Sequence, residues 1–516
     1  MNVVAFRNEP LADFSDEENR EAMRKALDAV RDSFGSVYPV VIDGKEILSG
    51  ITISSTNPSN PDEVVGVVHA GSKEIVDEAI VSASDAFEKW SRTHANSRAS
   101  CLFSAASILR KRRFEINATM VFEVGKTWIE ADADTAEAID FLEYYGRQAL
   151  LLAGDRDVYA YGGELTTYRY RPLGVGAVIP PWNFPAAILT GMTSSALVTG
   201  NTAVLKPASD APVVGAKIAG ILYDAGIPGG VLNFVPGSGE SVGEELVVHP
   251  LTRFISFTGS MKAGKKIYEQ ASVVWKGQKW LKRAITEMGG KDAIIVDNPC
   301  DLQAAADATV ASAFGYQGQK CSACSRAIVV EEAYDGYVKL LHDKVRTLTV
   351  GNPEYPDVSM GPVSSKQAFD KVCSYIGIGK RDATLMAGGN PVGEKGYFIE
   401  PTIFVNVDPA SRLAQEEIFG PVLSVIKASD FDEALSIANN TPYGLTGGIF
   451  SSDRVHIERA RSDMHVGNLY INRKITGALV GVQPFGGFNM SGTCSKAGGP
   501  DYLPLFLQGQ SISERL

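Results

Sequence analysis

Short apolar runs alternate with amphipathic stretches along the middle of the chain, from about residue 174. The apolar runs are expected to form buried strands, and they are GVGAVI (174–179), TAVLK (202–206), VLNFV (231–235), RFISF (253–257) and DAIIV (292–296). The stretches between them have a helical period, at 211–226, 241–249 and 261–271. Pro212 near the start and Gly226 at the end are typical boundaries of the first helix. Strands that alternate with helices at this spacing predict a parallel sheet with helices on both faces.

A second series of the same kind follows, and a mainly helical region precedes the first. The second series begins with a helix at 301–316 and a strand at 326–330, and it ends in a Gly-rich segment at 476–499. The earlier part of the chain predicts helices at 74–92, 98–120 and 128–149. GGELTTYRYRP (162–172) alternates like a pair of strands and predicts a projecting hairpin. The economical architecture is two α/β domains with a smaller β element.

Residues 172–205 contain no Asp, Glu, Lys or Arg, so they resemble a membrane span. Prolines 180, 181 and 185 and Gly191 interrupt the stretch, and a membrane helix would not tolerate so many breaks. We interpret the stretch as a buried strand, a loop and a helix.

The composition is that of a globular protein and narrows the classes of function. Hydrophobic residues make up 45% and charged residues 21% of the 516 residues, which excludes a disordered chain and a small disulfide scaffold. The net charge of −11 argues against a nucleic acid or an anionic membrane as the main partner. Six cysteines are too few for a disulfide framework, and the N-terminus lacks a signal-type apolar core. A reduced, cytoplasmic protein is therefore expected.

Two Gly-rich segments resemble nucleotide-binding loops without matching them. Gly237, Gly239 and Gly243 lie between a strand and a helix, as in a dinucleotide-binding turn, but their spacing differs by one residue and fits an ordinary turn equally well. The segment 259–266 follows the P-loop pattern until Lys266, which occupies the place of the hydroxyl that binds magnesium. A nucleoside triphosphatase is therefore not expected.

Cys321 and Cys324 have the spacing of a redox pair or half a zinc site. The six histidines show no paired spacing that could complete a zinc site, and no metal is expected. A single nucleophilic thiolate suits the setting better, because Lys320 next to Cys321 is expected to lower the thiol pKa from about 8.5. Spacing alone leaves a nucleophile and an inert core cysteine equally open. A nucleophile would need a base and an oxyanion donor, for which Glu287 and Asn183 are candidates.

Charged helix positions are interpreted more simply. Asp134, Glu137 and Asp140 have the spacing of a solvated acidic helix face, and the run Arg110–Arg113 that of a solvated basic face.

Seven motifs together give a specific resemblance. They are PPWNFP (180–185), KPAS (206–209), FTGS (257–260), EMGGKD (287–292), FGYQGQKC (314–321), EEIFGPV (416–422) and PFGGF (484–488). In this order and spacing they resemble the aldehyde dehydrogenase superfamily over essentially the whole chain. Four longer segments are most similar to its branch that oxidises glutamate 5-semialdehyde: FRNEP (6–10), EVGKTWIEADADTAEAIDFLEYY (123–145), SAFGYQGQKCSACSR (312–326) and HVGNLYINRKITGALVGVQPFGGFNMSGT (465–493).

The resemblance implies a fold with three parts. A Rossmann-like NAD(P)-binding domain would comprise residues 1–153 and 172–288, and a catalytic α/β domain residues 289–488. A small β oligomerisation element would comprise residues 154–171 and 489–516. Through this element the chain would form a homodimer or a dimer-based homo-oligomer.

The resemblance also implies a mechanism. Cys321 would add to the aldehyde carbon, with the oxyanion held by the Asn183 amide and the Cys321 N–H. A nicotinamide would take the hydride and leave a thioester, which water activated by Glu287 would hydrolyse. The product would be glutamate, in the second step of proline breakdown, which can also serve arginine breakdown.

The implied cofactor residues surround the expected dinucleotide. They are Pro181 and Trp182 in the cleft, Lys206 and Ser209 at the adenosine ribose, Gly239, Gly259 and Ser260 at the adenosine and pyrophosphate, and Glu417 and Phe419 at the nicotinamide end. Many relatives carry Glu where this chain has Ser209. A glutamate there would repel a 2′-phosphate, so the serine predicts NAD as the main cofactor with NADP also accepted, although Asp210 is adjacent.

The implied substrate site binds an amino acid. Ser322 and the N–H groups of Gly477 and Ala478 would hold the carboxylate, with Lys320 nearby. Phe184 and Phe485 would clamp the aliphatic part, and Glu137 would lie near the aldehyde.

Three alternatives remain open. The chain could oxidise another aldehyde, such as succinic semialdehyde or a betaine precursor; it could be a non-catalytic protein with the same fold; or it could be a thiol-redox or zinc protein that uses Cys321 and Cys324.

Overall fold

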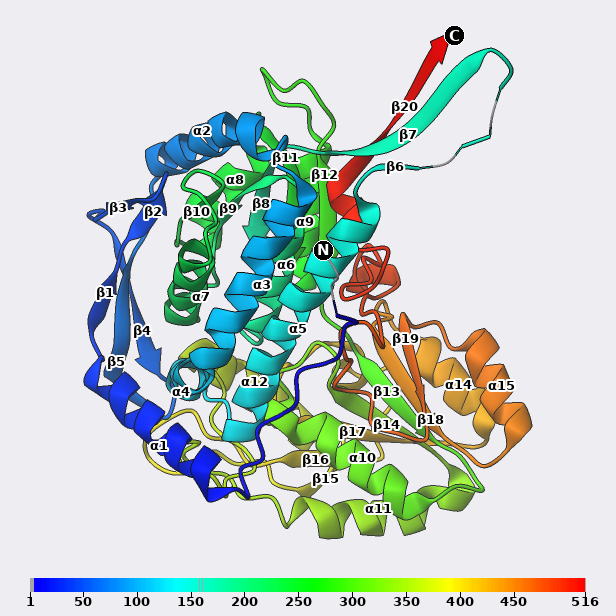
Figure 1. Ribbon diagram of the computed structural model, residues 1–516. Coiled ribbons are helices and arrows are strands. Elements are labelled where there is room, and N and C mark those ends of the chain that lie inside the picture. The colour runs from blue at the N-terminus through cyan, green and yellow to red at the C-terminus, as the bar shows by residue number, and fades with distance from the viewer. Residues whose placement is uncertain (1–3, 157, 160, 516) are drawn as a thin grey trace.

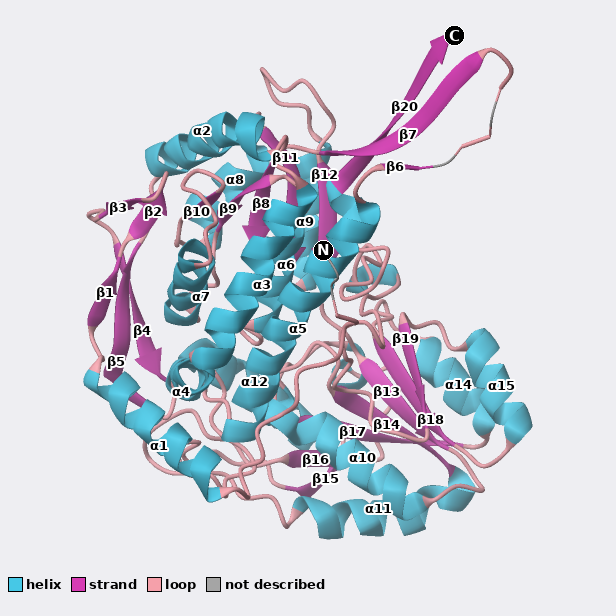
Figure 2. Ribbon diagram, viewed as in Figure 1, coloured by secondary structure: helices cyan, strands magenta, loops and turns pink. Residues whose placement is uncertain are grey.

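Two seven-stranded sheets form the body of the molecule (Figure 1). The computed structural model describes residues 4–156, 158–159 and 161–515. Figure 2 shows helices around both sheets and a β arm that leaves the body.

The first sheet is parallel at its centre. Its strands are, in spatial order, β12 (Arg283–Glu287), β11 (Thr252–Thr258), β8 (Val175–Ile179), β9 (Thr202–Leu205), β10 (Leu232–Phe234), β2 (Val40–Ile42) and β3 (Lys45–Ile47). Strands β12 to β10 run parallel, and β2 joins β10 antiparallel. A small separate sheet contains β1 (Ser36–Tyr38), β4 (Thr52–Asn57) and β5 (Asn60–His69).

Helices cover both faces of this sheet. They are α1 (Glu17–Asp32), α2 (Lys73–Trp90), α3 (Ala95–Lys111), α4 (Arg113–Val124), α5 (Trp128–Leu152), α6 (Ala187–Val198), α7 (Pro212–Asp224), α8 (Glu244–Val248) and α9 (Met261–Ser272). Ala177 and Ile179 point into a core with α2, α8 and α9. Val178 and Leu205 point into the opposite core with α3, α5, α6 and α7. Each strand is therefore apolar on both faces, which explains the continuous apolar runs in the sequence.

The second sheet is built in the same way. Its order is β15 (Thr384–Ala387), β16 (Thr402–Val405), β17 (Val422–Ala428), β14 (Cys324–Val330), β13 (Asp292–Val296), β18 (Thr446–Phe450) and β19 (Asn468–Ile471). Only β15 pairs antiparallel within it. The associated helices are α10 (Leu302–Phe314), α11 (Glu331–Val345), α12 (Lys366–Asp382), α13 (Arg412–Gln415), α14 (Phe431–Asn439) and α15 (Arg454–Asp463).

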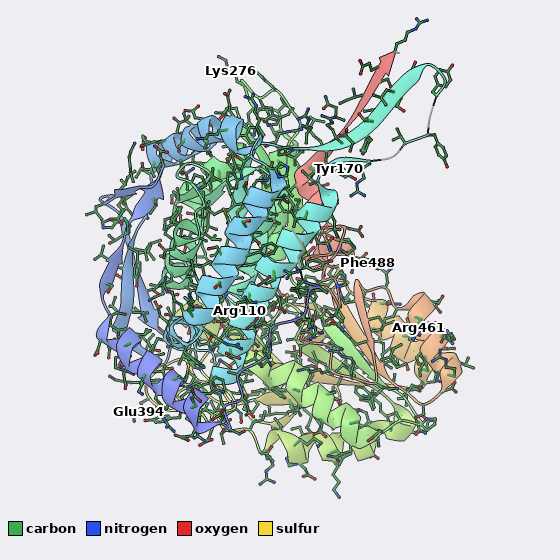
Figure 3. All side chains as sticks on the ribbon, viewed as in Figure 1. Arg110, Tyr170, Lys276, Glu394, Arg461 and Phe488 are labelled. Carbon is green, nitrogen blue, oxygen red and sulfur yellow. The ribbon has the colours of Figure 1, made fainter. Side chains whose placement is uncertain are left out.

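A three-stranded antiparallel arm projects from the body (Figure 1). It contains β6 (Asp155–Arg156), β7 (Glu164–Pro172) and the C-terminal β20 (Leu507–Arg515). The expected strand pair within 162–172 is wrong in its partner, because β7 pairs with β20 along its whole length and only briefly with β6. Side chains of the arm extend into solvent beyond Tyr170 (Figure 3). The arm is completed by β20, which lies far from β7 in the sequence. The alternation of residues within 162–172 could not reveal this pairing.

The charged helix positions differ most from expectation. The predicted helix at 98–120 is two helices, α3 and α4, that meet at Arg112. The Arg113 side chain is only 13% exposed, and its Nε donates to Asp132 at 2.6 Å. Asp134 and Asp140 are buried, so the expected solvated acidic face is wrong. The basic face is solvated at Arg110 and Lys111, as predicted, whereas Arg113 and the acidic residues are buried against partners that the helix pattern does not reveal.

The uncharged stretch at 172–205 forms β8, a loop and α6, as predicted. None of the helices in the described part of the chain combines the length and the apolar character that a membrane crossing requires.

Candidate active site

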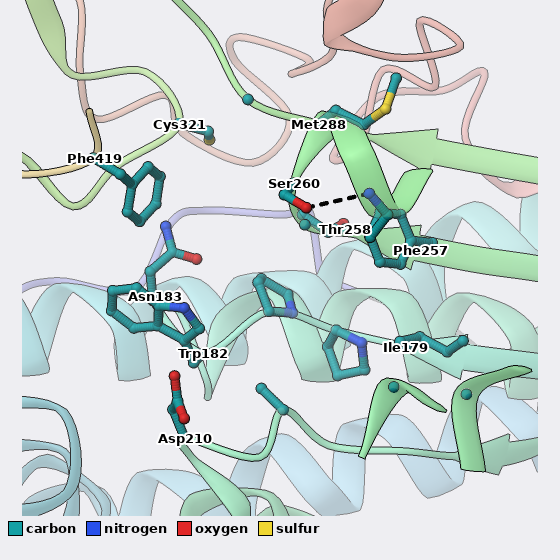
Figure 4. A pocket seen from close by; sticks show the side chains of 18 of the residues that line it. Ile179, Trp182, Asn183, Asp210, Phe257, Thr258, Ser260, Met288, Cys321 and Phe419 are labelled. Carbon is teal, nitrogen blue, oxygen red and sulfur yellow. Dashed lines mark hydrogen bonds between the residues drawn. The ribbon is translucent and has the colours of Figure 1, made fainter. Parts of the chain in front are cut away.

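A cavity of about 570 Å³ opens at the carboxyl ends of the first sheet. Residues that directly follow four strands line this cavity. They are residues 180–183 after β8, Lys206 after β9, residues 259–260 after β11 and residues 288–289 after β12. In parallel α/β sheets, ligands bind in the crevice at this edge. Figure 4 shows the pocket with Trp182, Asn183, Asp210, Cys321 and Phe419 around it.

Most of the predicted cofactor residues line this cavity. They are Pro181, Trp182, Lys206, Gly239, Gly259, Ser260, Glu417 and Phe419. Ser209 is not among the lining residues; its hydroxyl donates to the Gly237 carbonyl at 3.2 Å. The next residue, Asp210, presents its carboxylate to the cavity instead. The side chain that faces the cavity here is therefore the carboxylate of Asp210, whereas the sequence suggested the neutral hydroxyl of Ser209.

Lys206 lies buried in the cavity wall. Its ammonium donates to the Pro207 carbonyl at 3.0 Å. Burial lowers the pKa of Lys206 to about 8, against the opposing effect of the Asp210 charge. The side chain offers further N–H donors to a ligand in this cavity.

The Glu417 carboxylate rests on the backbone of two consecutive glycines. Gly290 N–H donates to its Oε1 at 3.2 Å, and a Cβ at Gly289 would collide with the carboxylate. A Cβ at Gly290 would collide with Asp292 and approach the Cys321 carbonyl. At both glycines of the EMGGKD motif a side chain would therefore meet atoms of a neighbouring segment. Their absence of a side chain allows Glu417 and the Cys321 loop to lie close to the end of β12.

Two aromatic rings complete the wall beside Glu417. Trp182 and Phe419 meet edge to face, with centroids 5.6 Å apart. Phe419 adopts a left-handed backbone conformation, with φ of 61°. Such a conformation is costly for a large side chain and persists only where the surroundings impose it.

Cys321 follows a tightly held turn between α10 and β14. Tyr316 and Gln317 are left-handed, with φ of 51° and 56°. The Gln317 amide donates to the carbonyls of Gly125, at 3.0 Å, and Pro362, at 2.7 Å. The turn is thereby fixed to two distant segments, which sets the place of Cys321.

Asn183 lines the same cavity as Cys321. Its buried amide donates to the Gln319 carbonyl at 3.0 Å, two residues before the thiol. The amide is thus tied to the Cys321 turn and can direct its second N–H into the cavity.

The Cys321 thiol is electrostatically disfavoured as a thiolate. Burial raises its pKa above the usual range, and the charges of Asp292, Glu417 and Glu287 raise it further. The Lys320 ammonium is paired with Glu130 at 2.8 Å. The prediction that Lys320 lowers the pKa of Cys321 is therefore wrong. A nucleophilic Cys321 needs a base to take its proton.

Glu287 ends β12 close enough for its charge to affect Cys321, but it does not line the cavity. The Ser495 hydroxyl and N–H donate to its Oε1 at 2.7 and 3.1 Å. Burial raises the pKa of Glu287 to about 7, although the Ser495 hydrogen bonds oppose this rise. A carboxyl with this pKa can serve as a general base near neutral pH.

Cys324 is set apart from this chemistry. It begins β14, is buried, and donates to the Arg326 carbonyl at 3.4 Å. In the described part of the chain, no group of three or more His, Cys, Asp or Glu side chains is arranged to hold a metal ion.

Predicted substrate residues belong to a second region, beside α5, where lysines and carboxylates interleave. Lys126 and Asp134 are fully buried and paired at 2.9 Å. The charges of Lys126, Lys320 and Lys474 all act on Glu130 and lower its pKa. Burial raises the pKa of Glu137 to about 8, and the Asp134 charge adds to this rise. This region therefore brings both signs of charge together, with Lys126 and Asp134 fully buried.

Of the remaining predicted substrate residues, Phe184 lies beside Lys126, whereas Gly477, Ala478 and Phe485 belong to the loop that follows Lys474, and Ser322 directly follows Cys321. The Phe184 ring lies 4.0 Å from the Lys126 ammonium. Gly477 is left-handed, with φ of 76°, and Ala478 follows it. Phe485 is held to Ala497 by two backbone hydrogen bonds of 2.8 Å. The Ser322 carbonyl accepts a hydrogen bond from the Thr446 hydroxyl at 3.4 Å.

Comparison with known proteins agrees with this geometry. A family model described as the aldehyde dehydrogenase family matches residues 48–512. The chain belongs to the aldehyde dehydrogenase family. A 1-pyrroline-5-carboxylate dehydrogenase of Geobacillus kaustophilus is 56% identical over 512 residues, 99% of each chain. One of Bacillus cytotoxicus is 55% identical over 514 residues, the whole of both chains. A solved structure of 1-pyrroline-5-carboxylate dehydrogenase from Thermus with bound NAD has 52% identity and a TM-score of 0.99 over the whole of both chains.

Several polar residues of this aldehyde dehydrogenase escaped the sequence reasoning. Lys126 and Glu130 make the ion pairs described above, the charge of Lys474 acts on Glu130, and Ser495 donates to Glu287 from a distant part of the chain. No periodicity marks such partners. For Lys126, Glu130 and Lys474 the one available signal was their position inside the longer segments that resemble the family, and Ser495 lies just beyond the last of these segments.

Proposed function

We propose that this aldehyde dehydrogenase oxidises L-glutamate 5-semialdehyde, formed from 1-pyrroline-5-carboxylate, to L-glutamate with NAD. The observation that carries the proposal is the charge arrangement beside α5. Three lysines and three carboxylates interact there, and one of the lysines, Lys320, directly precedes Cys321. An α-amino acid head group carries one charge of each sign, and such a site can pair both.

The carboxylate of the substrate is assigned to Ser322, Gly477 and Ala478, with Lys320 adding positive charge. Gly477 permits a backbone conformation that a larger residue would resist. Consecutive N–H groups in such a turn form a concave site for an anion. Phe184 and Phe485 would contact the aliphatic part, and Glu137 would lie near the aldehyde.

The cavity residues fit a dinucleotide. A Cβ at Gly239 would meet open space, so the backbone there is free for close approach by a ligand. Lys206 can donate to ribose hydroxyls and Glu417 can accept from them, while Trp182 and Phe419 offer apolar walls. NAD bound there supplies the acceptor for the hydride that leaves the substrate carbon.

The chain's own residues account for the remaining chemistry. The Cys321 thiol releases its proton to water in the open cavity as its sulfur forms a bond to the aldehyde carbon, and the developing oxyanion accepts hydrogen bonds from the Asn183 amide and the Cys321 N–H. After oxidation the acyl group is held as a thioester on Cys321. Glu287 takes a proton from water, whose oxygen attacks the thioester carbon and releases the acid and the thiol.

We also propose the assembly and setting of the enzyme. Residues 1–153 and 172–288 would bind the cofactor, and residues 289–488 would carry the catalytic thiol. Residues 154–171 and 489–516 would join two copies in a dimer or a dimer-based oligomer. The arm carries exposed apolar side chains, including Tyr161 and Leu165, that suit such an interface. We expect the enzyme in the cytoplasm, in the breakdown of proline and of arginine.

The test is a comparison of initial rates with 1-pyrroline-5-carboxylate, succinic semialdehyde and a simple aliphatic aldehyde. A strong preference for the first substrate is expected, together with loss of turnover in Cys321→Ser. A preference for succinic semialdehyde would overturn the substrate assignment and leave the thiol chemistry standing. Normal turnover by Cys321→Ser would refute the covalent mechanism.

A further inference from the structure

The N-terminal segment, residues 4–14, lies as a strap along α5 between Trp128 and Arg147. Its dark blue trace runs beside α5 toward α1 in Figure 1, and Figure 3 labels Arg110 close to it. We refer to residues 4–14 as the N-terminal strap. The mechanism above makes no use of it, although it contains the FRNEP segment at 6–10.

Contacts with the strap follow one side of α5 from its C-terminal end to its start. Arg147 donates to the Val4 carbonyl at 2.9 Å, and Tyr144 meets the Phe6 ring edge to face. The Ala12 N–H donates to Asp132 at 2.7 Å, and Phe14 packs against Trp128. The strap is therefore a docked element with a fixed register along the helix.

Asn8 connects this helix to the loop 476–485. Its amide donates to Asp140 Oδ2 on α5 at 2.8 Å and to the Val480 carbonyl at 2.9 Å. The Glu9 N–H donates to the other oxygen of the Asp140 carboxylate, Oδ1, at 2.7 Å. One side chain thus holds two segments that lie 340 positions apart (Val480 minus Asp140).

The other side of the same loop is also fixed. Gly481 N–H donates to the Gly498 carbonyl at 2.8 Å. A Cβ at Gly481 would lie 3.1 Å from Phe6 and 3.2 Å from Tyr144, so the loop backbone packs directly on these rings. Gly477 and Ala478 therefore belong to a loop clamped between the strap and the C-terminal segment.

We propose that Asn8 is a positioning residue that sets the affinity for the amino acid head group of the substrate. It holds the loop of Gly477 and Ala478 at a fixed distance from α5, which carries Glu137. This inference rests on the proposed function, because it takes that loop as the carboxylate anchor. Asn8 acts through the loop and touches neither substrate nor cofactor.

The first experiment is steady-state kinetics of Asn8→Ala. We expect KM for the semialdehyde to rise about tenfold, as loss of two half-buried hydrogen bonds allows. The KM for NAD, and kcat/KM for a simple aliphatic aldehyde, should be unchanged, because neither uses the anchor loop. Asn19→Ala is the matched control; its amide donates to the Asp13 carbonyl at 3.0 Å, away from the loop. An unchanged KM for the semialdehyde in Asn8→Ala would overturn the proposal.

A double variant separates positioning from docking of the strap. In Asn8→Asp with Asp140→Asn, the amide at 140 can donate to the carboxylate at 8, but nothing replaces the donor to Val480. We expect the thermal midpoint to match that of Asp140→Asn alone, while KM for the semialdehyde remains raised. Recovery of KM would show that docking of the strap to α5 is sufficient, and would refute the role of the Val480 bond.

Hydrogen exchange on the unaltered protein covers the case in which the variants fail to fold. In low urea, the amides of Glu9, Ala12 and Gly481 should open with equal free energy, since the strap and loop form one unit. Independent opening of Gly481 would overturn the proposal. If the unaltered enzyme does not oxidise the semialdehyde, the proposed function fails, whereas the exchange result still decides whether strap and loop are coupled.

Discussion

The Cys321 thiol and the Glu287 carboxyl both have pKa values raised by burial. For Glu287 the rise is useful, because a base is most effective when its pKa lies near the working pH. For Cys321 the rise means that the resting thiol is protonated and protected from adventitious reaction. Neither effect is visible in the motifs, which identify the residues and not their surroundings.

The pH dependence of turnover should follow Glu287. Its carboxylate is the active form, so kcat should fall about tenfold per pH unit as the pH drops below about 7, where the group is protonated. Glu287→Gln should release about one equivalent of reduced cofactor per site in a burst and then stop, because the thioester persists. The control is Glu240→Gln, an exposed carboxyl. A linear time course in Glu287→Gln would contradict the assigned role.

Asp210 should limit the use of NADP. Its carboxylate lines the cavity and would repel a 2′-phosphate, whereas the Ser209 hydroxyl is engaged with Gly237. Asp210→Asn should lower KM for NADP about fivefold and leave KM for NAD nearly constant, as expected for removal of one partly screened charge. The measurement is KM for each cofactor at low ionic strength. An equal change in both values would show that Asp210 does not face the phosphate position.

At the scale of elements, the carboxyl ends of the strands in the first sheet determine where the candidate site lies. Four strands of the first sheet deliver residues to one cavity, and the glycines after β12 allow Glu417 to close it from the second sheet. The sequence predicted β8, β9 and β11 nearly to the residue, because both of their faces are apolar, but it did not predict β12. It did not predict the break between α3 and α4, where the Arg-rich run makes ion pairs with distant carboxylates.

Gly289→Ala tests the close approach of Glu417. The added methyl group would displace the carboxylate, so KM for NAD should rise about tenfold or more while the fold is retained. The matched control is Gly220→Ala in α7, where an added Cβ meets nothing within 4 Å. This control should leave KM unchanged and slightly raise the thermal midpoint. Equal KM values in the two variants would refute the role of Gly289.

At the scale of the whole molecule, the chain ends act far from their place in the sequence. The C-terminal strand β20 completes the arm with β7, and the segment before it supplies Ser495 to Glu287. The N-terminal strap connects α5 to the loop 476–485. Both ends therefore depend on the packed body for their structure.

Removal of residues 509–516 should disrupt assembly. Residues 509–515 pair with residues 164–170 of β7, and without them the arm loses most of its hydrogen bonds. Light scattering should report a lower mass than for the full chain, while circular dichroism stays close to that of the full chain because β20 belongs to neither large sheet. An unchanged mass would show that the arm does not join the copies.

The sequence by itself determined the α/β class, the order of most strands and helices, and the family, because apolar runs and short motifs are local. Only the tertiary structure decided which charges are buried, which carboxylate approaches Gly289 and how Lys320 is paired. The contacts of Glu417 with Gly289 and of Lys320 with Glu130 join segments that are more than a hundred residues apart. The pKa values of Cys321 and Glu287 follow from contacts of the same kind, since burial and neighbouring charges exist only in the folded chain.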